Sequence, residues 1–399
     1  MTGDDLAALR RHRHPRRHLE GGPAFAELFT TDVFLVDIKT NCDEGRPVTA
    51  KGRVAARVRM PDGTRLKTLA SVVGPHPDRR WPHALFQPPN PARSTERHEM
   101  SWLTDLDHDA TGAVDLVIEP GVKDLGSFRV RRALPSVQRR MVGPFIFLDH
   151  MGPDIFQPGA GMDVRPHPHI GLATLTYLVD GGIRHRDTLG TIADIAPGDV
   201  NWMTAGRGIA HSERTAPERR GGGLRMQGIQ SWIALPRAHE EDAPAFYHHD
   251  AADLPHLEDG GIRLRLIAGH AYGATSPVHM DWSMVYADAT LAEGASLPLP
   301  DEHAERAVYI LDGEVQVAGE AYGAHRLLVF RPGDRITLRA QRPSRVIVLG
   351  GEPMDGPRHL WWNFVHSSKD RIAAAKADWR AGRFGLVPGD DREFIPLPA

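Results

Sequence analysis

The sequence predicts an all-β fold, a sandwich or a barrel built from many short strands. Its 40 glycines and 32 prolines are spread along 399 residues, and short β-branched or aromatic runs lie between them. Residues 173–179 (ATLTYLV) and 344–351 (SRVIVLGG) are examples. Such runs between turn-forming residues are typical of sandwiches and barrels. No glycine-rich loop opens a helix and strands do not alternate with helices, which disfavours a nucleotide-binding α/β fold.

The composition is that of an ordinary globular protein, with 41% apolar and 25% charged residues. The length predicts two or three domains. A balance of 48 basic and 51 acidic residues gives a net charge of −3, which disfavours direct binding of nucleic acid. No apolar run approaches the roughly 20 residues that span a bilayer, so no membrane partner is expected. A single cysteine, Cys42, and a start without the apolar core of a signal peptide predict a cytoplasmic location.

Residues 1–114 differ from the rest and are predicted to form an N-terminal extension of unknown role. Residues 33–40 (VFLVDIKT) read as a strand. Residues 51–71 alternate between apolar and polar side chains across Pro61-Asp62-Gly63, which predicts a β-hairpin.

The remainder contains two similar stretches, residues 176–200 and 309–334. Each has a strand, an Asp-Gly turn, more strand and then Pro-Gly-Asp. Such turns also recur by chance in β-proteins, but the matching order and spacing favour a duplicated β-module. Residues 236–261 are rich in Pro, Ala and acidic residues and read as the connection. We therefore expect one β-domain over 115–243 and a second over 244–399.

One helix is predicted near the end, within residues 367–384. Ser367 and Asp370 form a capping-box pattern, and Gly382 supplies the stop. A shared apolar face predicts that the helix packs back on a sheet. The residues of this face are Ile372, Ala375 and Trp379.

The strongest chemical signal lies between residues 165 and 214. His167 and His169 are two apart, as are His211 and Glu213. Positions i and i+2 of a strand project from the same face, so two adjacent strands could aim three imidazoles and one carboxylate at one point. That donor set suits a divalent first-row metal. Isolated histidines are usually surface or hydrogen-bonded residues, but two same-face pairs favour a metal site.

Other polar groups are weaker candidates. His185 and Asp187 share a strand face near the predicted site, where they either support the metal ligands or form a structural pair. The run His248-His249-Asp250 looks metal-like, but it lies in the connecting segment, and we expect it at the surface.

The spacing His167-x-His169, then Thr174, then Gly181 resembles the first motif of the cupins, and residues 198–206 resemble the second. More specifically, residues 115–396 resemble pirin and the bacterial pirin-like proteins. The resemblance depends on VKDLGSFRVRRALPSVQRRMVGPFIFLDHMGP (122–153), HPHIGLATLTYL (167–178), HRDTLG (185–190) and the highly specific PGDVNWMTAGRGIAHSE (197–213). It continues in QSWIALP (230–236) and DWRAGRF (378–384).

This resemblance implies a bicupin fold, two double-stranded β-helix barrels, with one metal in the first cupin. Its four ligands map onto His167, His169, His211 and Glu213. The family's pocket glutamine before a tryptophan matches Gln230 ahead of Trp232. Iron is the first expectation for the metal, and nickel, copper, manganese or zinc are alternatives.

Some pirin-like proteins are quercetin dioxygenases, which implies an enzyme that opens a flavonol or a related enol with O₂. In such an enzyme Glu213 would also serve as the general base. Two alternatives stay open. The first is a non-enzymatic, redox-sensing metal regulator that binds a partner protein. The second is a barrel in which a fully ligated metal is only structural.

The second copy is predicted to lack a metal site. Aligning Gly313 with Gly181 places Arg306 at the position of Thr174, and Leu299 and Asp301 at the positions of the histidine pair. Pirin-like chains usually begin shortly before residues 114–126 (VDLVIEPGVKDLG), so either Met100 is the natural start or residues 1–99 are a genuine upstream segment. In both cases we expect residues 1–99 to be dispensable for the metal site, because neither cupin lacks a strand that they would supply.

Overall fold

The computed structural model describes the backbone of residues 30–40, 48–59 and 65–76, and it describes residues 112–398 except 279 and 281. The chain divides into two compact units, Met1–Thr95 and Glu96–Ala399. The first unit contains an antiparallel sheet with strand order β1 (Thr30–Thr40), β2 (Val48–Arg59) and β3 (Arg65–His76). The pairing of β2 with β3 confirms the predicted hairpin. Its turn at Pro61-Asp62-Gly63, like Cys42 and Met100, lies outside the described residues.

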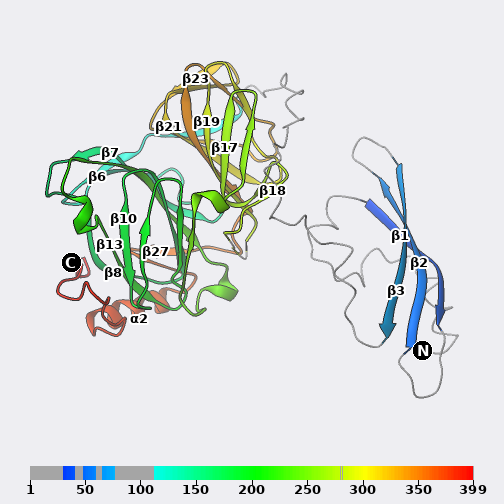
Figure 1. The fold of residues 1–399 in the computed structure, drawn as a ribbon, viewed down its shortest axis with the longest axis horizontal. Helices are drawn as coiled ribbons and strands as arrows, with labels where there is room; N and C mark the ends of the chain where they lie inside the picture. The colour runs from blue at the N-terminus through cyan, green and yellow to red at the C-terminus, as the bar shows by residue number, and fades with distance from the viewer. Residues whose placement is uncertain are drawn as a thin grey trace. The chain divides into compact units, whose positions relative to one another are not determined.

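The second unit contains two β-barrels, each made of a large and a small antiparallel sheet (Figure 1). This confirms the expected bicupin architecture. In the first barrel, a four-stranded sheet has the order β11 (Ile192–Ile195), β10 (Ile183–Asp187), β13 (Ile209–Arg214), β8 (Asp163–His169). The seven-stranded sheet has the order β15 (Ala245–His249), β12 (Val200–Thr204), β9 (Leu172–Asp180), β14 (Leu224–Ala234), β7 (Phe145–Phe156), β6 (Arg129–Leu134), β5 (Gly121–Asp124).

The second barrel repeats this plan. Its eight-stranded sheet has an antiparallel path of seven strands, from which β18 (Ala274–Thr275) branches at β17. The path is β16 (His256–Asp259), β17 (Ile262–Ala271), β19 (Met284–Leu291), β26 (Ser344–Gly351), β21 (Glu305–Asp312), β24 (Leu327–Phe330), β4 (Val114–Ile118). The smaller sheet has the order β20 (Ser296–Pro298), β25 (Thr337–Ala340), β22 (Glu314–Val317), β23 (Glu320–Gly323).

The two barrels share one apolar core, to which the large sheets of both contribute. Strand β9 is buried on both of its faces, because one face belongs to this shared core and the other faces the interior of the first barrel. The polar atoms within the shared core are hydrogen-bonded across it. The Tyr177 hydroxyl donates to Asp288 at 2.6 Å, and the Ser231 and Tyr286 hydroxyls are bonded at 2.9 Å. These hydrogen bonds offset the free-energy cost of burying the polar groups.

The strands next to the expected boundaries at 115 and 244 pair with the neighbouring barrel, and a C-terminal hairpin also returns to the first barrel. Strand β4 pairs with β24 of the second barrel, although the chain continues from it into the first barrel. Strand β15 pairs with β12 of the first barrel. After the second barrel, the hairpin of β27 (His359–Trp361) and β28 (Phe364–His366) returns to the first barrel, where Phe364 forms a bridge with Ile170. The two cupins are thus joined by exchanged segments as well as by a linker.

Helix α2 (Lys369–Arg380) lies beneath the first barrel in Figure 1 and packs on it through the predicted face. The predicted cap is wrong by one residue, because the side chain of Ser368, not Ser367, accepts the hydrogen bond from the Arg371 N–H. The Ser367 hydroxyl is used elsewhere, as a donor to Glu240 at 2.5 Å. The buried side chains of the helix are Ile372, Ala375 and Trp379.

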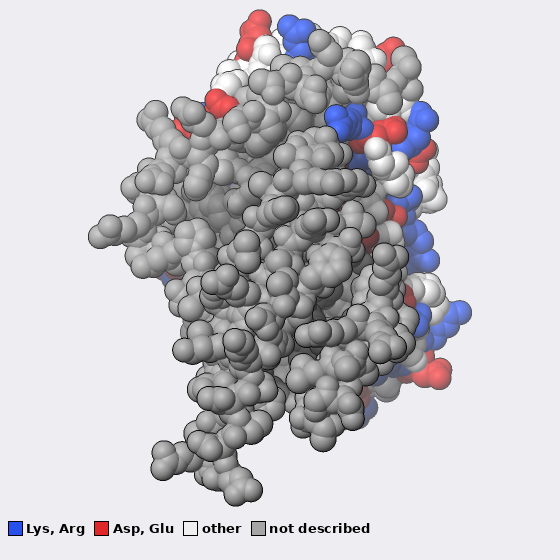
Figure 2. Space-filling model, turned by 90° about the vertical axis from the view of Figure 1, so that its right-hand side faces the viewer, with Lys and Arg blue, Asp and Glu red and all other residues white. Residues whose placement is uncertain are grey.

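Charged side chains of both signs are mixed on the described part of the face shown in Figure 2, without a patch of one sign. Within the described residues, none of the helices has the length and apolar character needed to cross a membrane.

Candidate metal centre

Three histidines meet inside the first barrel, on the adjacent strands β8 and β13. His167 and His169 project from one face of β8 because they are two residues apart. On β13, His211 lies directly opposite His167 in the antiparallel register. The predicted convergence of the three imidazoles is therefore present in the structure.

The three rings form a compact cluster. Ring centroids lie 4.4 Å apart for His167 and His211, and 5.0 Å apart for the other two pairs. One nitrogen from each ring lies within 4.8 Å of the other two. All three side chains are buried, His169 and His211 at 1% exposure.

Hydrogen bonds at the opposite ring nitrogens orient two of these imidazoles. The Nδ1 atom of His167 lies 2.9 Å from the carbonyl of Arg165, and Nδ1 of His169 lies 3.1 Å from the carbonyl of Asn363. A carbonyl only accepts, so each Nδ1 carries the proton and each Nε2 presents a lone pair. A ligating histidine commonly donates its other N–H to a carbonyl or carboxylate in this way.

The protonation of the cluster also suits metal binding. Burial lowers the pKa of His167 to about 4, and it lowers the pKa of His169 and of His211 well below the usual value. All three rings are therefore neutral near pH 7, the state in which imidazole binds a metal.

The unpaired nitrogens test whether a metal fits. The Nε2 atoms of His169 and His211 are buried and have no hydrogen-bond partner. Leaving a buried polar atom unpaired costs about 1–3 kcal/mol, so such atoms in a native fold call for an explanation. Convergent neutral imidazoles are good ligands for a divalent first-row metal, which would satisfy both atoms. The donor set therefore fits a metal ion.

Glu213, the fourth predicted ligand, lies beside this cluster on β13. A shift in the β8–β13 register falls between His211 and Glu213. No carboxylate oxygen of Glu213 belongs to the group of ligand atoms within 4.8 Å of one another. Its Oε1 instead accepts a hydrogen bond from the Thr176 hydroxyl at 3.0 Å. Burial raises the pKa of Glu213, against the effects of His185 and Thr176.

The predicted pocket residues Gln230 and Trp232 both lie on β14 near this centre. The Oε1 atom of Gln230 lies 2.9 Å from the Thr176 hydroxyl, which has one proton and donates to Glu213 or Gln230 at any one time. Trp232 meets the ring of His169 edge-on, with centroids 5.0 Å apart, and stacks on Phe147 at 3.9 Å. Thr176 was not singled out in the sequence, although it is two residues from Thr174 on the same strand face.

His185 and Asp187 lie on β10, directly opposite Glu213 and His211 respectively. The Nδ1 atom of His185 lies 3.4 Å from Nδ1 of His211, and its Nε2 lies 3.0 Å from Oδ2 of Asp187. Asp187 is fully buried, and its other oxygen accepts from the Leu189 N–H at 2.8 Å. His185 thus pairs with Asp187 and also contacts a histidine of the cluster, so both arrangements left open by the sequence are present together.

The second barrel has a different side chain at the matching place. Arg306 is 1% exposed, and its guanidinium donates to the carbonyls of Asp334 at 2.6 Å and Pro300 at 3.2 Å. Leu299 is buried and Asp301 is exposed, so the residues aligned with His167 and His169 do not share an interior position. The hydrogen-bond acceptors of the buried Arg306 side chain are thus backbone carbonyls inside this barrel.

A second group of metal-ligand atoms within 4.8 Å contains Asp199, His248 and Asp250. His248 is hydrogen-bonded there to Asn201 at 2.7 Å and to Asp250 at 3.2 Å. Asp250 is exposed, in keeping with the surface position expected for this run. Unlike His169 and His211, His248 has partners for both ring nitrogens.

Two barrels of this topology, one with a buried histidine cluster at the cupin spacing, define a bicupin. The family model described as Pirin matches residues 127–233, and the model described as Pirin C-terminal cupin domain matches residues 286–385. A pirin-like protein of Caulobacter vibrioides is 54% identical over 288 residues, which are 71% of this chain and 99% of that protein. The chain belongs to the pirin family.

Two further comparisons cover the same region. Rat pirin is 30% identical over 267 residues, which are 65% of this chain and 88% of pirin. The crystal structure of a quercetin 2,3-dioxygenase from Acinetobacter baumannii is 36% identical and superimposes with a TM-score of 0.66, covering 71% of this chain and 95% of that one.

Proposed function

We propose that this chain is a metal-dependent dioxygenase that opens flavonols such as quercetin, or related enols, with O₂. The observation that carries the proposal is the buried cluster of three neutral histidines, two of which have an unpaired Nε2 atom. The likeness to the Acinetobacter quercetin dioxygenase supports the choice of reaction.

In this proposal, one metal ion per chain is held by the three histidines of the cluster together with Glu213. Iron is the first choice, ahead of nickel, copper, manganese and zinc. When bound, the ion would supply Lewis-acid and redox chemistry that brings an enolate and O₂ together.

Glu213 has a second role, as the acceptor of the proton from the substrate's enol hydroxyl. Burial raises its pKa, which makes its carboxylate a better proton acceptor than an exposed one. Thr176 donates to the same carboxylate at 3.0 Å and so orients it. Gln230 shares that hydroxyl, and the edge of Trp232 against His169 supplies an apolar wall next to the cluster.

Asp187 and His185 position His211. If His185 Nε2 donates to the Asp187 carboxylate, its Nδ1 has a free lone pair. That lone pair can accept from the His211 Nδ1–H, 3.4 Å away, and His211 then directs the lone pair of Nε2 into the cluster. The series of contacts from Asp187 through His185 to His211 therefore fixes His211 in the tautomer that a metal ligand needs.

Metal content and oxygen uptake test this proposal. Replacing His167 and His169 together by Ala should abolish metal content while the chain stays folded, whereas His248→Ala should leave it unchanged. Wild-type protein that has been loaded with the metal should consume O₂ when a flavonol is added. Glu213→Gln should retain some metal but lose turnover by roughly 10²-fold or more, the usual contribution of a positioned general base.

Two results would overturn it. Stoichiometric metal in the double alanine variant would refute the site. Absence of oxygen uptake with any flavonol, after loading with iron, copper and nickel in turn, would refute the activity and favour the regulator that binds a partner protein. The predicted partner protein and cytoplasmic location stay predictions.

A further inference from the structure

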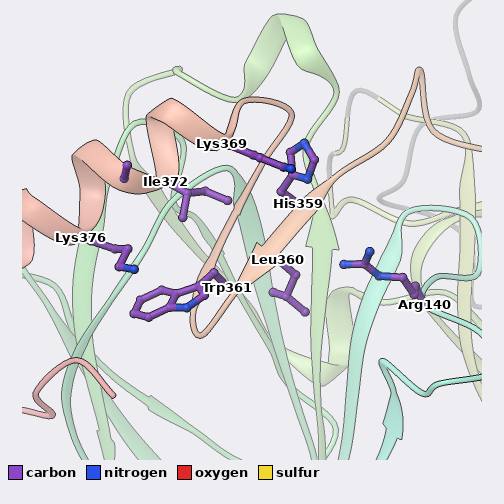
Figure 3. A pocket seen from close by; sticks show the side chains of 8 residues that line it. Arg140, His359, Leu360, Trp361, Lys369, Ile372 and Lys376 are labelled. Carbon is purple, nitrogen blue, oxygen red and sulfur yellow. The ribbon is translucent and has the colours of Figure 1, made fainter. Parts of the chain in front are cut away.

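A cavity of about 300 Å³ lies between helix α2 and strand β27, apart from the residues of the metal centre. Four of its lining residues come from one face of α2, at the helical spacing i, i+3, i+4 and i+7. Figure 3 shows this face opposite the side chains of β27, with Arg140 at the far end. The helical residues are Lys369, Ile372, Ala373 and Lys376.

Positive charge is concentrated around this cavity. Arg140, Lys369 and Lys376 line it together with His359, and no aspartate or glutamate does so. Among the described residues, no carboxylate oxygen lies close enough (4.0 Å or less) to form an ion pair with Arg140, Lys369 or Lys376. Three cations spaced along one cavity without a carboxylate give it a positive potential, which favours an anionic ligand.

The remaining wall is apolar. Leu360 and Trp361 of β27 face Ile372 and Ala373 of α2. The ammonium of Lys376 lies over the ring of Trp361, 3.8 Å from its centroid, so this cation is held at the wall. Apolar walls with a few convergent charged groups, and a volume of about 300 Å³ or more, are typical of sites for small organic ligands.

We propose that this cavity binds a small organic carboxylate, with its charged head among the lysines and Arg140 and its apolar body against Leu360 and Ile372. A fully hydrated inorganic anion would gain little from the apolar wall, and a neutral ring would leave Arg140 and Lys369 without a counter-charge. Only a molecule that has both an anionic group and an apolar body would contact both the cations and the apolar wall. The site does not depend on the proposed dioxygenase activity.

Titration calorimetry of the full chain with benzoate tests the proposal. Benzoate should bind saturably, and benzyl alcohol, its neutral counterpart, should bind at least 10-fold more weakly. Replacing Lys369 and Lys376 together by Gln should weaken benzoate binding at least 10-fold, which corresponds to about 1.4 kcal/mol. Lys123→Gln, which removes an exposed lysine of β5, should have no effect.

The metal centre must be excluded as the place of binding, because a carboxylate also binds metals. The variant with His167 and His169 both replaced by Ala should therefore bind benzoate as the wild type does. Equal binding by the lysine variant, or no saturable binding up to about 10 mM, ten times a weak Kd of about 1 mM, would overturn the proposal. Binding of inorganic phosphate as tight as that of benzoate would overturn the assignment to an organic ligand.

Discussion

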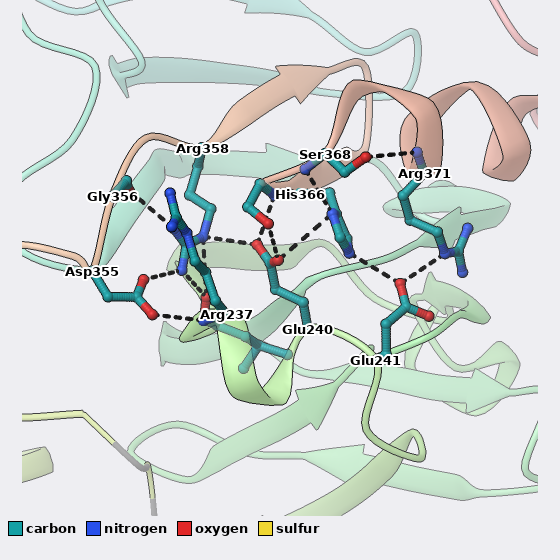
Figure 4. A network of polar contacts seen from close by, with 11 residues as sticks. Arg237, Glu240, Glu241, Asp355, Gly356, Arg358, His366, Ser368 and Arg371 are labelled. Carbon is teal, nitrogen blue, oxygen red and sulfur yellow. Dashed lines mark hydrogen bonds and ion pairs between the residues drawn. The ribbon is translucent and has the colours of Figure 1, made fainter.

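The sharpest stability prediction concerns Glu240, whose carboxylate is buried against Arg358 (Figure 4). Their side chains are 2% and 0% exposed, and Nε of Arg358 lies 2.8 Å from Oε1 of Glu240. The same carboxylate accepts from the Ser367 N–H at 2.8 Å. Glu240 follows the short helix η5 (Arg237–His239) in the segment that joins the barrels, so this ion pair ties that segment to the returning C-terminal part of the chain.

Glu240→Ala should lower the free energy of unfolding by about 3–5 kcal/mol, because it removes the buried one of the two carboxylates that neutralise the Arg358 guanidinium. Asp355 and the carbonyl of Leu235 still contact that guanidinium, at 2.5 and 2.8 Å, which places the expected loss within this range rather than above it. An unfolding entropy of about 2.1 cal/mol/K per residue over roughly 290 residues converts the loss into a decrease in Tm of about 5–8 °C.

The neighbouring carboxylate offers a matched control. Glu241 is 53% exposed and pairs with Arg371 at 2.7 Å and with His366 at 3.0 Å, so Glu241→Ala should cost no more than about 1 kcal/mol. Urea unfolding followed by circular dichroism, together with calorimetric Tm values, would measure both variants. Equal losses for the two alanine variants would refute the argument that burial makes the Glu240 pair critical.

Three other predictions follow from the site and the fold. His185→Phe, which removes the acceptor for His211, should weaken metal affinity by about 10–100-fold in a competitive chelator titration; unchanged affinity would exclude the positioning role. Burial lowers the pKa of His150 from 6.5 to about 3, so the unfolded chain binds a proton before the folded one does. This group therefore leaves stability intact above pH 6.5 and lowers it as the pH falls toward 3, by up to about 1.4 kcal/mol per pH unit. The His150→Gln variant lacks this contribution, so the difference in unfolding free energy between wild type and variant should show the slope when both are unfolded in urea at pH 7, 6 and 5; a difference that does not change with pH would refute it. A chain that begins at Met100 should keep its metal content, because both barrels lie within residues 112–398; aggregation or metal loss would show that the N-terminal segment is needed.

Sequence reasoning succeeded where the relevant spacing is local. The i, i+2 spacing of His167 and His169 was sufficient to place both rings on one face of β8, and the apolar face of helix α2 followed from its periodicity. The choice between Ser367 and Ser368 as the cap could not be predicted, because either hydroxyl can serve. What decides it is the bond from Ser367 to Glu240, a residue 127 positions away.

The partners of the site were harder to predict, because several are backbone atoms or distant in sequence. The carbonyl that orients His169 belongs to Asn363, 194 residues away, and a backbone carbonyl leaves no signal in residue type. The pairing of β4 with the second barrel could not be predicted either, because it also depends on a partner distant in sequence. Its apolar pattern specifies that it must pair with another strand, but not with which one.

The returning C-terminal segment links stability to the metal centre. His169 is buried, so water cannot serve as the acceptor for its Nδ1–H, and the acceptor must come from the protein. The turn between β27 and β28 supplies it through Asn363. That hairpin is fixed on one side by the bridge from Phe364 to Ile170, and beyond it Ser367 is bonded to Glu240. Loosening the Glu240 ion pair should therefore reduce metal affinity as well as Tm, whereas the surface variant at Glu241 should leave metal affinity unchanged and lower Tm by no more than about 2 °C.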